Sequence, residues 1–175
     1  MPLKSLRYFR PDFMSLKVPH PLWTSCGENS FEISKAIIQA KFLSGRYRTD
    51  SLLCHFGKND TPVCSLCQES VEGSVEHLLV LCDKLKQCRE NQFKMLDERK
   101  DISDVSRKLI YDSFKKSVSN FVQVLVDCSS LPTIINATQG NGNSHILTEI
   151  FKISRTWCFN IHMHRMKLLG RWRPS

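Results

Sequence analysis

Three cysteines and one histidine lie close together near the middle of this chain. Cys64, Cys67, His77 and Cys82 follow the spacing C-x2-C-x9-H-x4-C. Three thiolates and one imidazole form a complete tetrahedral ligand set for a structural zinc ion, and four protein ligands leave no open position for a substrate. The spacing therefore predicts one zinc ion per chain, with a role in structure or recognition rather than in metal catalysis.

The residues between these ligands are typical of a loop followed by a helix. The two-residue gap lets the first two sulfurs turn back onto one metal, and Gly73 lies in the polar loop that brings the second pair round. Ser74 can cap a helix that starts at the next residue and carries His77 in an early turn. His55, and after it Cys88, are the residues most able to replace one of the four as a ligand.

Eight cysteines in 175 residues admit two other interpretations. A disulfide framework needs an oxidising compartment, but residues 1–7 lack the apolar core of a secretory signal. Ordinary buried thiols are a common fate of free cysteine. Four cysteines inside apolar or helical patterns fit that second interpretation: Cys54, Cys88, Cys128 and Cys158. The polar loop around Cys64 does not fit it, so we expect a metal site, reduced thiols and a nuclear or cytoplasmic protein.

Positive charge is concentrated at the C-terminal end of the chain. The formal net charge is +8, and residues 146–175 hold six basic residues and one acidic residue. A cationic end on a nearly neutral body is typical of a protein that binds a polyanion, although a solvated helix face with a basic tail has the same pattern. No run of about 18 apolar residues occurs, so we expect no transmembrane helix and no membrane partner.

Helical patterns dominate the rest of the chain. Helices are expected at 31–44, 75–99, 105–116, 118–128 and 146–169, and a short helix capped by Asp50 is expected to end at Gly57. Asn29 and Glu32 resemble a capping box at the start of the first helix, and Gly45 suits its end. One face of the last helix is apolar and is predicted to be a core face: Leu147, Ile150, Ser154, Trp157 and Ile161. The predicted fold is mainly α, a small helical domain with a CCHC zinc-binding loop-helix and a long basic C-terminal helix.

Composition divides the chain into four regions. Residues 1–28 are rich in proline and predict an extended arm or linker, and residues 29–135 predict a helical region that carries the zinc motif at 64–82. Residues 136–145 predict a flexible linker, and residues 146–175 a basic C-terminal helix and tail.

No motif in the sequence indicates catalysis. A nucleophile elbow, a P-loop, a dinucleotide fingerprint and an H-E-x-x-H helix are all missing from the sequence, so we expect neither an enzyme nor a small-molecule substrate. His162 and His164 are two residues apart on an expected helix and do not face the same way, which favours surface or nucleic-acid contact over metal binding.

Arg46, Tyr47 and Arg48 are the best candidates for recognition before the zinc loop. Arginine binds a phosphate with two parallel hydrogen bonds, and tyrosine can stack on an unpaired base. Alternatively, Tyr47 packs on the core while the arginines cover acidic groups. The position, one short helix before the zinc loop, favours recognition. Further nucleic-acid contacts are predicted near the C-terminus: Arg165, Lys167, Arg171, Trp172 and Arg173.

Residues 42–50 have the sequence FLSGRYRTD, and a short helix, the C-x2-C pair and E-H-L-L-x2-C follow. This combination resembles the C-terminal region of the reverse transcriptases of non-LTR retrotransposons, and residues 13–23 and 155–172 extend the similarity to nearly the whole chain. The resemblance implies a fragment of a transposable-element enzyme that lacks the polymerase and endonuclease domains. It also implies a region that helps to grip template RNA and target DNA.

We therefore expect a zinc-stabilised nucleic-acid-binding module, with RNA and/or DNA as its partner and no catalytic activity. The alternative is a zinc-stabilised protein-docking module without direct nucleic-acid contact. In that case the apolar arm and the Trp157 face would be exposed and would bind a partner such as the missing polymerase region. One continuous cationic patch would favour the first function, and arginines scattered around an apolar groove would favour the second.

Overall fold

The computed structural model describes Tyr8 and residues 19–67, 69–129, 131–138 and 144–171. Within these ranges the regular secondary structure is helical, and the only β-type pairing is an isolated bridge, which confirms the predicted mainly α fold. In chain order the α-helices are α1 (Pro21–Thr24), α2 (Ser30–Leu43), α3 (Asp50–His55), α4 (Lys86–Glu98), α5 (Asp104–Lys116), α6 (Val118–Asp127), α7 (Pro132–Thr138) and α8 (Ser144–Leu168). No described helix is both long enough and apolar enough to cross a membrane.

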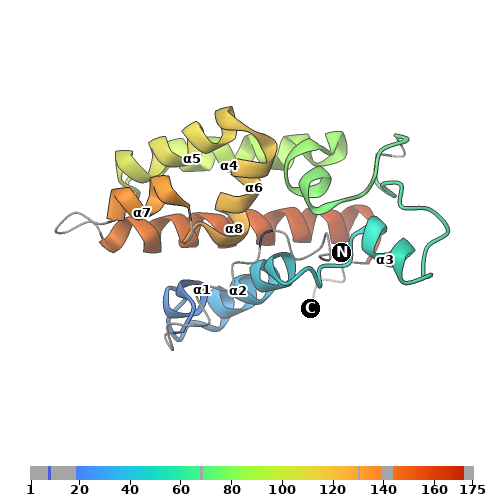
Figure 1. Ribbon diagram of the computed structural model, residues 1–175, viewed down its shortest axis with the longest axis horizontal. Helices are drawn as coiled ribbons and strands as arrows, with labels where there is room; N and C mark the ends of the chain where they lie inside the picture. Colours follow the sequence, from blue (N-terminus) through green and yellow to red (C-terminus); the bar gives the residue numbers. More distant parts are fainter. Residues whose placement is uncertain (1–7, 9–18, 68, 130, 139–143, 172–175) are drawn as a thin grey trace.

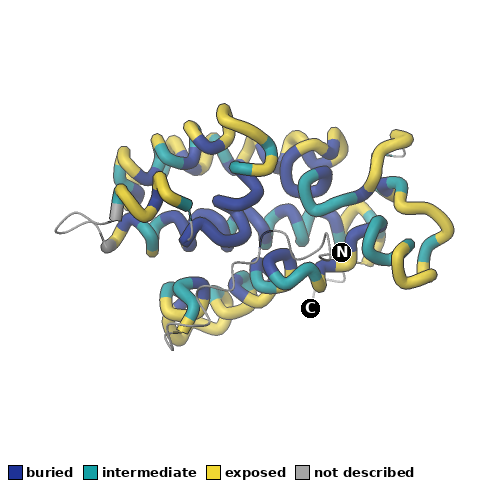
Figure 2. The backbone as a smooth tube through the Cα atoms, in the orientation of Figure 1, coloured by how far each residue is buried: buried dark blue, intermediate teal, exposed yellow. Residues whose placement is uncertain are grey.

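The last helix, α8, is the centre of the fold. It runs along the molecule with α2 on one side and with α4, α5 and α6 on the other (Figure 1). Burial is greatest where these layers meet (Figure 2). Ile150, Trp157 and Ile161 are almost completely buried, Trp157 with 1% of its surface exposed, which confirms the predicted core face. The Trp157 face is therefore not the exposed surface that the docking alternative required.

Aromatic rings join three of these helices in the core. The Trp157 ring of α8 meets Phe93 of α4 at 4.9 Å and Phe121 of α6 at 5.2 Å between ring centroids, both edge to face. Edge-to-face pairs add roughly 0.5–1.5 kcal/mol each to the burial of their apolar surface. The long C-terminal helix is thus anchored in the core well before its basic end.

Local sequence explains where the helices around the site begin and end. The Asn29 side chain accepts hydrogen bonds from the amides of Phe31 and Glu32 and starts α2, as predicted. Gly45, at φ +65°, lets the chain leave α2 in the left-handed conformation. The cap of α3 is Thr49 and not Asp50, because the hydroxyl of Thr49 accepts from the Leu52 amide. The Asp50 side chain is thereby left for another role.

Three predicted boundaries differ from the structure. The helix expected at 75–99 is interrupted: a π-helical turn, η3 (His77–Leu81), and a 3-10 turn, η4 (Asp83–Leu85), precede α4. The arm contains the short helix α1, which starts with a proline and is capped by the His20 ring. Helix α7 runs through Thr138 into the expected linker, whose residues 139–143 lie outside the described ranges.

Candidate metal centre and basic groove

The loop that carries the first two cysteines is folded back on itself by backbone hydrogen bonds. The Cys64 amide donates to the Val71 carbonyl at 2.9 Å, and the Gly73 amide donates to the Pro62 carbonyl at 2.8 Å. An isolated antiparallel bridge joins the same two segments. These contacts fix residues 62–73 in a tight turn, called the knuckle below. The knuckle presents Cys64 and Cys67 toward the helical turn that follows it.

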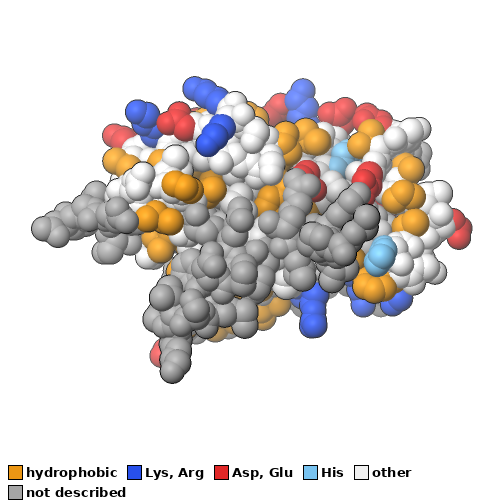
Figure 3. Space-filling model, viewed as in Figure 1, with side chains coloured by type: hydrophobic (Ala, Val, Ile, Leu, Met, Phe, Trp, Pro, Cys, Tyr) orange, Lys and Arg blue, Asp and Glu red, His pale blue; other side chains and the backbone are white. Residues whose placement is uncertain are grey.

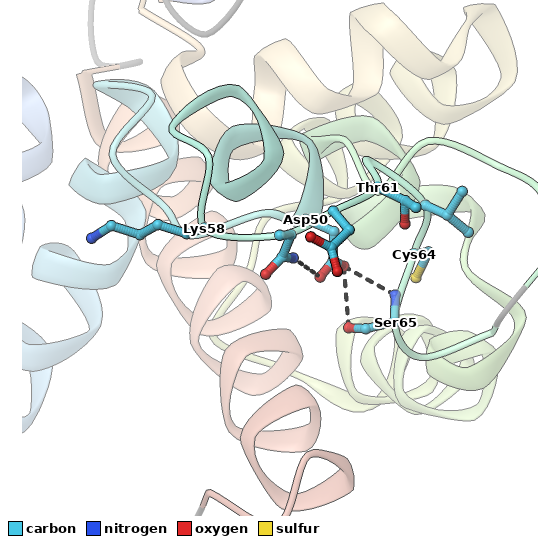
Figure 4. Close-up of a pocket in the computed structure, with 8 residues that line it drawn as sticks. Asp50, Lys58, Thr61, Cys64 and Ser65 are labelled. Carbon is cyan, nitrogen blue, oxygen red and sulfur yellow. Dashed lines mark hydrogen bonds between the residues drawn. The ribbon is translucent and has the colours of Figure 1, made fainter.

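Gly73 and Asp50 hold this knuckle against α3. Gly73 is buried, and a Cβ atom there would lie 2.9 Å from both the Cβ and the Oδ2 of Asp50. Asp50 Oδ2 accepts from the Ser65 amide at 3.1 Å and from its hydroxyl at 3.2 Å (Figure 4). Asp50 Oδ1 accepts from the Asn59 amide group at 3.3 Å. The buried carboxylate therefore joins the start of α3 to the first cysteine loop.

The π-helical turn explains how His77 and Cys82 reach one point. The Ser74 hydroxyl accepts from the His77 amide at 3.2 Å, which confirms the predicted cap. The Cys82 amide donates to the His77 carbonyl at 2.7 Å, an i→i+5 hydrogen bond. In an α-helix, residues five apart point about 140° away from each other. The wider turn reduces that angle and brings both side chains toward the knuckle.

The four predicted ligands come together in the structure. All four donor atoms of Cys64, Cys67, His77 and Cys82 lie within 4.8 Å of one another. The Sγ atoms of Cys64 and Cys82 are 4.0 Å apart, and Cys67 Sγ is 3.4 Å from His77 Nε2. Tetrahedral zinc would place two sulfurs about 3.8 Å apart and a sulfur and a nitrogen about 3.5 Å apart. The cluster forms no disulfide and is compatible with a metal ion.

Burial changes the protonation of the clustered side chains. Burial and the neighbouring Cys64 thiol raise the pKa of Cys82 to about 12, and burial also raises the pKa of Cys67. Burial lowers the pKa of His77, so its imidazole is neutral, as a ligand must be. A metal ion would stabilise the thiolates and displace their protons.

Groups around the cluster complete its environment. The buried Arg89 side chain donates to the Cys82 carbonyl at 2.8 Å, which places a positive charge beside the thiolate that Cys82 would form. Three thiolates around a divalent ion leave one net negative charge, which Arg89 can balance. His77 Nδ1 is buried without a hydrogen-bond partner among the described residues, whereas metal-bound histidines usually donate from their second nitrogen.

The other cysteines and histidines lie outside this cluster. Cys88 is buried in α4, and His55 is exposed with its ring edge-on to Phe56, so neither alternative ligand joins the cluster. Burial raises the pKa values of the Cys88, Cys128 and Cys158 thiols, as expected for core cysteines. All eight cysteines lie within the described ranges and are free.

The Arg46-Tyr47-Arg48 segment separates into two kinds of side chain. Arg46 and Arg48 are exposed, as recognition requires. Tyr47 has only 4% of its surface exposed, and its ring stacks on Phe42 with centroids 3.8 Å apart. Its hydroxyl meets His162 Nδ1 at 3.0 Å. The predicted stacking of Tyr47 on a base is therefore wrong, because both its ring and its hydroxyl are engaged in the interior.

Arg165 is also internal, in contrast to its predicted role at the basic end. Only 3% of its surface is exposed, and its guanidinium donates to the Arg48 carbonyl at 2.7 Å. A second guanidinium nitrogen lies 3.9 Å from Asp50 Oδ2. Arg165 therefore supports the Arg48 loop and α3 and is not free to contact phosphate. Lys167 and Arg171 are exposed, whereas Trp172 and Arg173 lie outside the described residues.

A basic groove lies where α3 meets the segment after α2. It has a volume of about 280 Å³. Its lining consists of Gly45, Arg46, Arg48, Leu52, Leu53, His55, Phe56 and Lys58. No acidic residue is part of this lining, and Lys58 also borders a second hollow beside the knuckle, with Asp50 and Cys64 (Figure 4). Phe56 is not among the site residues predicted from the sequence, because an aromatic residue at the end of a short helix has no local pattern that distinguishes an exposed ring from a buried one.

One end of the molecule therefore combines a four-residue metal cluster with a groove of exposed cations. Helix α3 links the two. Its first residue, Asp50, accepts a hydrogen bond from Ser65 in the cysteine loop, and Leu52, Leu53 and His55 of the same helix line the groove. Comparison of the chain with protein-family models, with curated proteins and with solved structures found no match.

Proposed function

We propose that this protein is a zinc-stabilised nucleic-acid-binding module, related to the C-terminal region of the reverse transcriptases of non-LTR retrotransposons. The observation that carries the proposal is the groove lined by Arg46, Arg48 and Lys58 without an acidic residue. Exposed arginine and lysine side chains bind the phosphates of nucleic acids, and phosphate contacts supply most of the affinity that is independent of sequence.

Zinc is the metal that the donor set favours. Thiolates and imidazole select zinc over magnesium or calcium, which prefer oxygen ligands. With four protein ligands the ion holds the knuckle and leaves no position for substrate chemistry. The role of the metal is to fix the loop against which Asp50 and α3 pack, and with them the groove. We propose no polymerase or nuclease activity for this chain.

The distribution of surface charge also favours nucleic-acid binding at the end of the molecule that carries α3. In the view of Figure 3, basic side chains along the upper edge, over α4 and α5, are interspersed with acidic ones. Basic side chains at the lower edge, near α3 and the end of α2, have no acidic side chain beside them in that view. Unpaired positive charge of this kind raises the local concentration of a polyanion.

The proposal is tested by salt titration of binding to an oligonucleotide. Replacing both Arg46 and Arg48 by alanine should lower the slope of log affinity against log salt by about 1.4–1.8, because each phosphate contact contributes about 0.7–0.9. The matched control replaces Lys115 and Lys116, an exposed pair at the end of α5, and removes the same charge. Its slope should stay near that of the unmodified protein. Equal slopes for the two double variants would contradict a role for the groove.

A second candidate function, protein docking, has two observations in its favour. The first is that Arg46 and Arg48 border a groove that also contains Leu52, Leu53 and Phe56. The second is a set of exposed apolar side chains on α1 and α2. Helix α2 exposes Ile33 and Ile37, which lie one turn apart on the same side of the helix, and the neighbouring α1 exposes Trp23. Exposed apolar side chains that gather on one face often mark a protein contact. This function predicts that the Arg46 and Arg48 replacements leave oligonucleotide binding unchanged, while polar replacements on α2 abolish binding of a protein partner.

A further inference from the structure

Phe56 is the most exposed large apolar side chain among the described residues, with 65% of its surface accessible. Its position is fixed by the end of α3. The Gly57 amide donates to the Cys54 carbonyl at 2.9 Å, the Lys58 amide donates to the Leu53 carbonyl at 2.8 Å, and Gly57 has a φ of +65°. This pair of hydrogen bonds is the Schellman arrangement, which ends a helix rigidly. The exposed ring is therefore held at the rim of the groove.

The groove around this ring is lined by both apolar and cationic side chains. Leu52 and Leu53 lie in the lining beside Phe56, and Arg46, Arg48 and Lys58 complete it. The rings of His55 and Phe56 meet in a T-shaped contact with centroids 5.4 Å apart, and 65% of the Phe56 surface remains accessible beside that contact. An aromatic face flanked by cations is the arrangement that proteins use to stack an unpaired base while binding its backbone.

Paired bases cannot use such a ring. In a duplex each base is stacked between its neighbours, and only single strands, loops and ends present a free face. We infer that the groove binds single-stranded nucleic acid, with one unpaired base stacked on Phe56 and the adjacent phosphates held by Arg46, Arg48 and Lys58. This inference rests on the proposed function and adds to it the strand class and the stacking residue.

The test compares Phe56→Leu and Phe56→Trp with the unmodified, zinc-loaded protein. The probes are single-stranded RNA, single-stranded DNA and a blunt DNA duplex of equal length, and each single strand carries one 2-aminopurine. Phe56→Leu should weaken single-strand binding roughly 5- to 150-fold, the loss expected when one stacked base loses its aromatic partner. Duplex binding should stay unchanged. Phe56→Trp should keep the affinity for single strands. The fluorescence of 2-aminopurine should be quenched in the complex with Phe56→Trp but not in the complex with Phe56→Leu.

Phe31→Leu is the matched control, because Phe31 is also an exposed phenylalanine but lies on α2 outside the groove. Zinc content and helical circular dichroism, checked for every variant, should match the unmodified protein. If Phe56→Leu binds single strands as well as the unmodified protein does, the inference is wrong, while a reduced salt slope for the Arg46 and Arg48 variant still supports the proposed function. If the unmodified protein binds none of the three probes, the proposed function and the inference both fail.

Discussion

Asp50 has a role that its position in the sequence conceals. As the first residue of α3 it resembles a helix cap, but Thr49 provides the cap and Asp50 is buried. Its carboxylate accepts hydrogen bonds from Ser65 in the knuckle and faces the guanidinium of Arg165 in α8. A buried carboxylate is tolerated only where such partners surround it. Asp50 thus connects the metal loop, the groove helix and the central helix.

Replacement of Asp50 by alanine should lower the free energy of unfolding by about 3 kcal/mol, because the Ser65 amide and the Arg165 charge would lose a buried partner. Asp50→Asn should cost less, since an amide oxygen can still accept from Ser65. The measurement is denaturant unfolding of the zinc-loaded protein. Asp60→Ala, which alters an exposed acid in the same region, serves as control. A loss as small as that of the control would mean that Asp50 has no structural role.

Metal content should depend on the four clustered residues alone. Cys82→Ser should reduce bound zinc from one equivalent to near zero, because a hydroxyl is a poor substitute for a thiolate ligand. Cys54→Ser should keep its zinc, since Cys54 lies in α3 outside the cluster. Elemental analysis of protein purified under reducing conditions makes the comparison. Full zinc content in the Cys82 variant would remove that residue from the ligand set.

Residue types and spacing were sufficient to predict the metal cluster but not the burial of individual side chains. Cys64 and Cys67 were recognisable because a cysteine pair in a polar loop has few other uses. Tyr47 and Arg165 looked like surface residues because their partners, His162 and Asp50, are more than 110 residues away along the chain. Pairing over such distances leaves no local pattern in a single sequence.

Among the elements, the π-helical turn at His77–Leu81 is the clearest departure from the predicted helices. Propensity and apolar spacing distinguish a helix from a strand, but they do not distinguish an i→i+4 turn from an i→i+5 turn. The spacing of four residues between His77 and Cys82 contained the missing information, because an α-helix would separate these side chains. The requirement to converge on one point predicts the wider turn.

The contact between the end of α2 and α8 should make stability depend on pH. Burial, together with the charges of Lys41 and Arg165, lowers the pKa of His162 below the ordinary value of 6.5. The unfolded chain therefore takes up this proton first as the pH falls. The stabilisation is complete above about pH 6.5 and is lost as the pH falls toward the lower pKa of the folded state.

His162→Gln should remove this part of the pH dependence, because glutamine can still meet the Tyr47 hydroxyl but does not titrate. The measurement is the difference in unfolding free energy between pH 7.5 and pH 5.5. That difference should be smaller in the variant than in the unmodified protein, and the contribution of His77 is common to both. An equal difference in the two proteins would exclude His162 as its source.

For the molecule as a whole, the formal charge of residues 146–175 overstates the charge available for binding. Arg155 is buried and contacts Ser25 and Glu32, and Arg165 is buried against the Arg48 loop. Two of the six cations counted in the sequence therefore hold the core together. The basic groove draws instead on Arg46, Arg48 and Lys58, which belong to the part of the chain that looked nearly neutral.

Two truncations should separate these roles. A chain that ends at Leu169 loses Arg171 and Arg173, and its salt slope should fall by at most about 1.8 with little change in melting temperature. A chain that ends at His164 also loses Arg165 and should melt at a lower temperature, because the Arg48 carbonyl and Asp50 lose their buried partner. Salt titration and thermal unfolding of both chains provide the test. Equal melting temperatures would show that Arg165 is dispensable for stability.

The central place of α8 also has a consequence for the order of events during synthesis. The ribosome makes α2 long before α8, yet the two helices pack against each other. Contacts between segments so far apart form late, because the intervening chain must first be closed into a large loop. Until residues 144–168 emerge, α2 lacks the helix with which it shares its most extensive contact. The Cys64, Cys67, His77 and Cys82 cluster lies within residues 64–82, so a metal ion that binds there would need only this short segment and not the rest of the nascent chain.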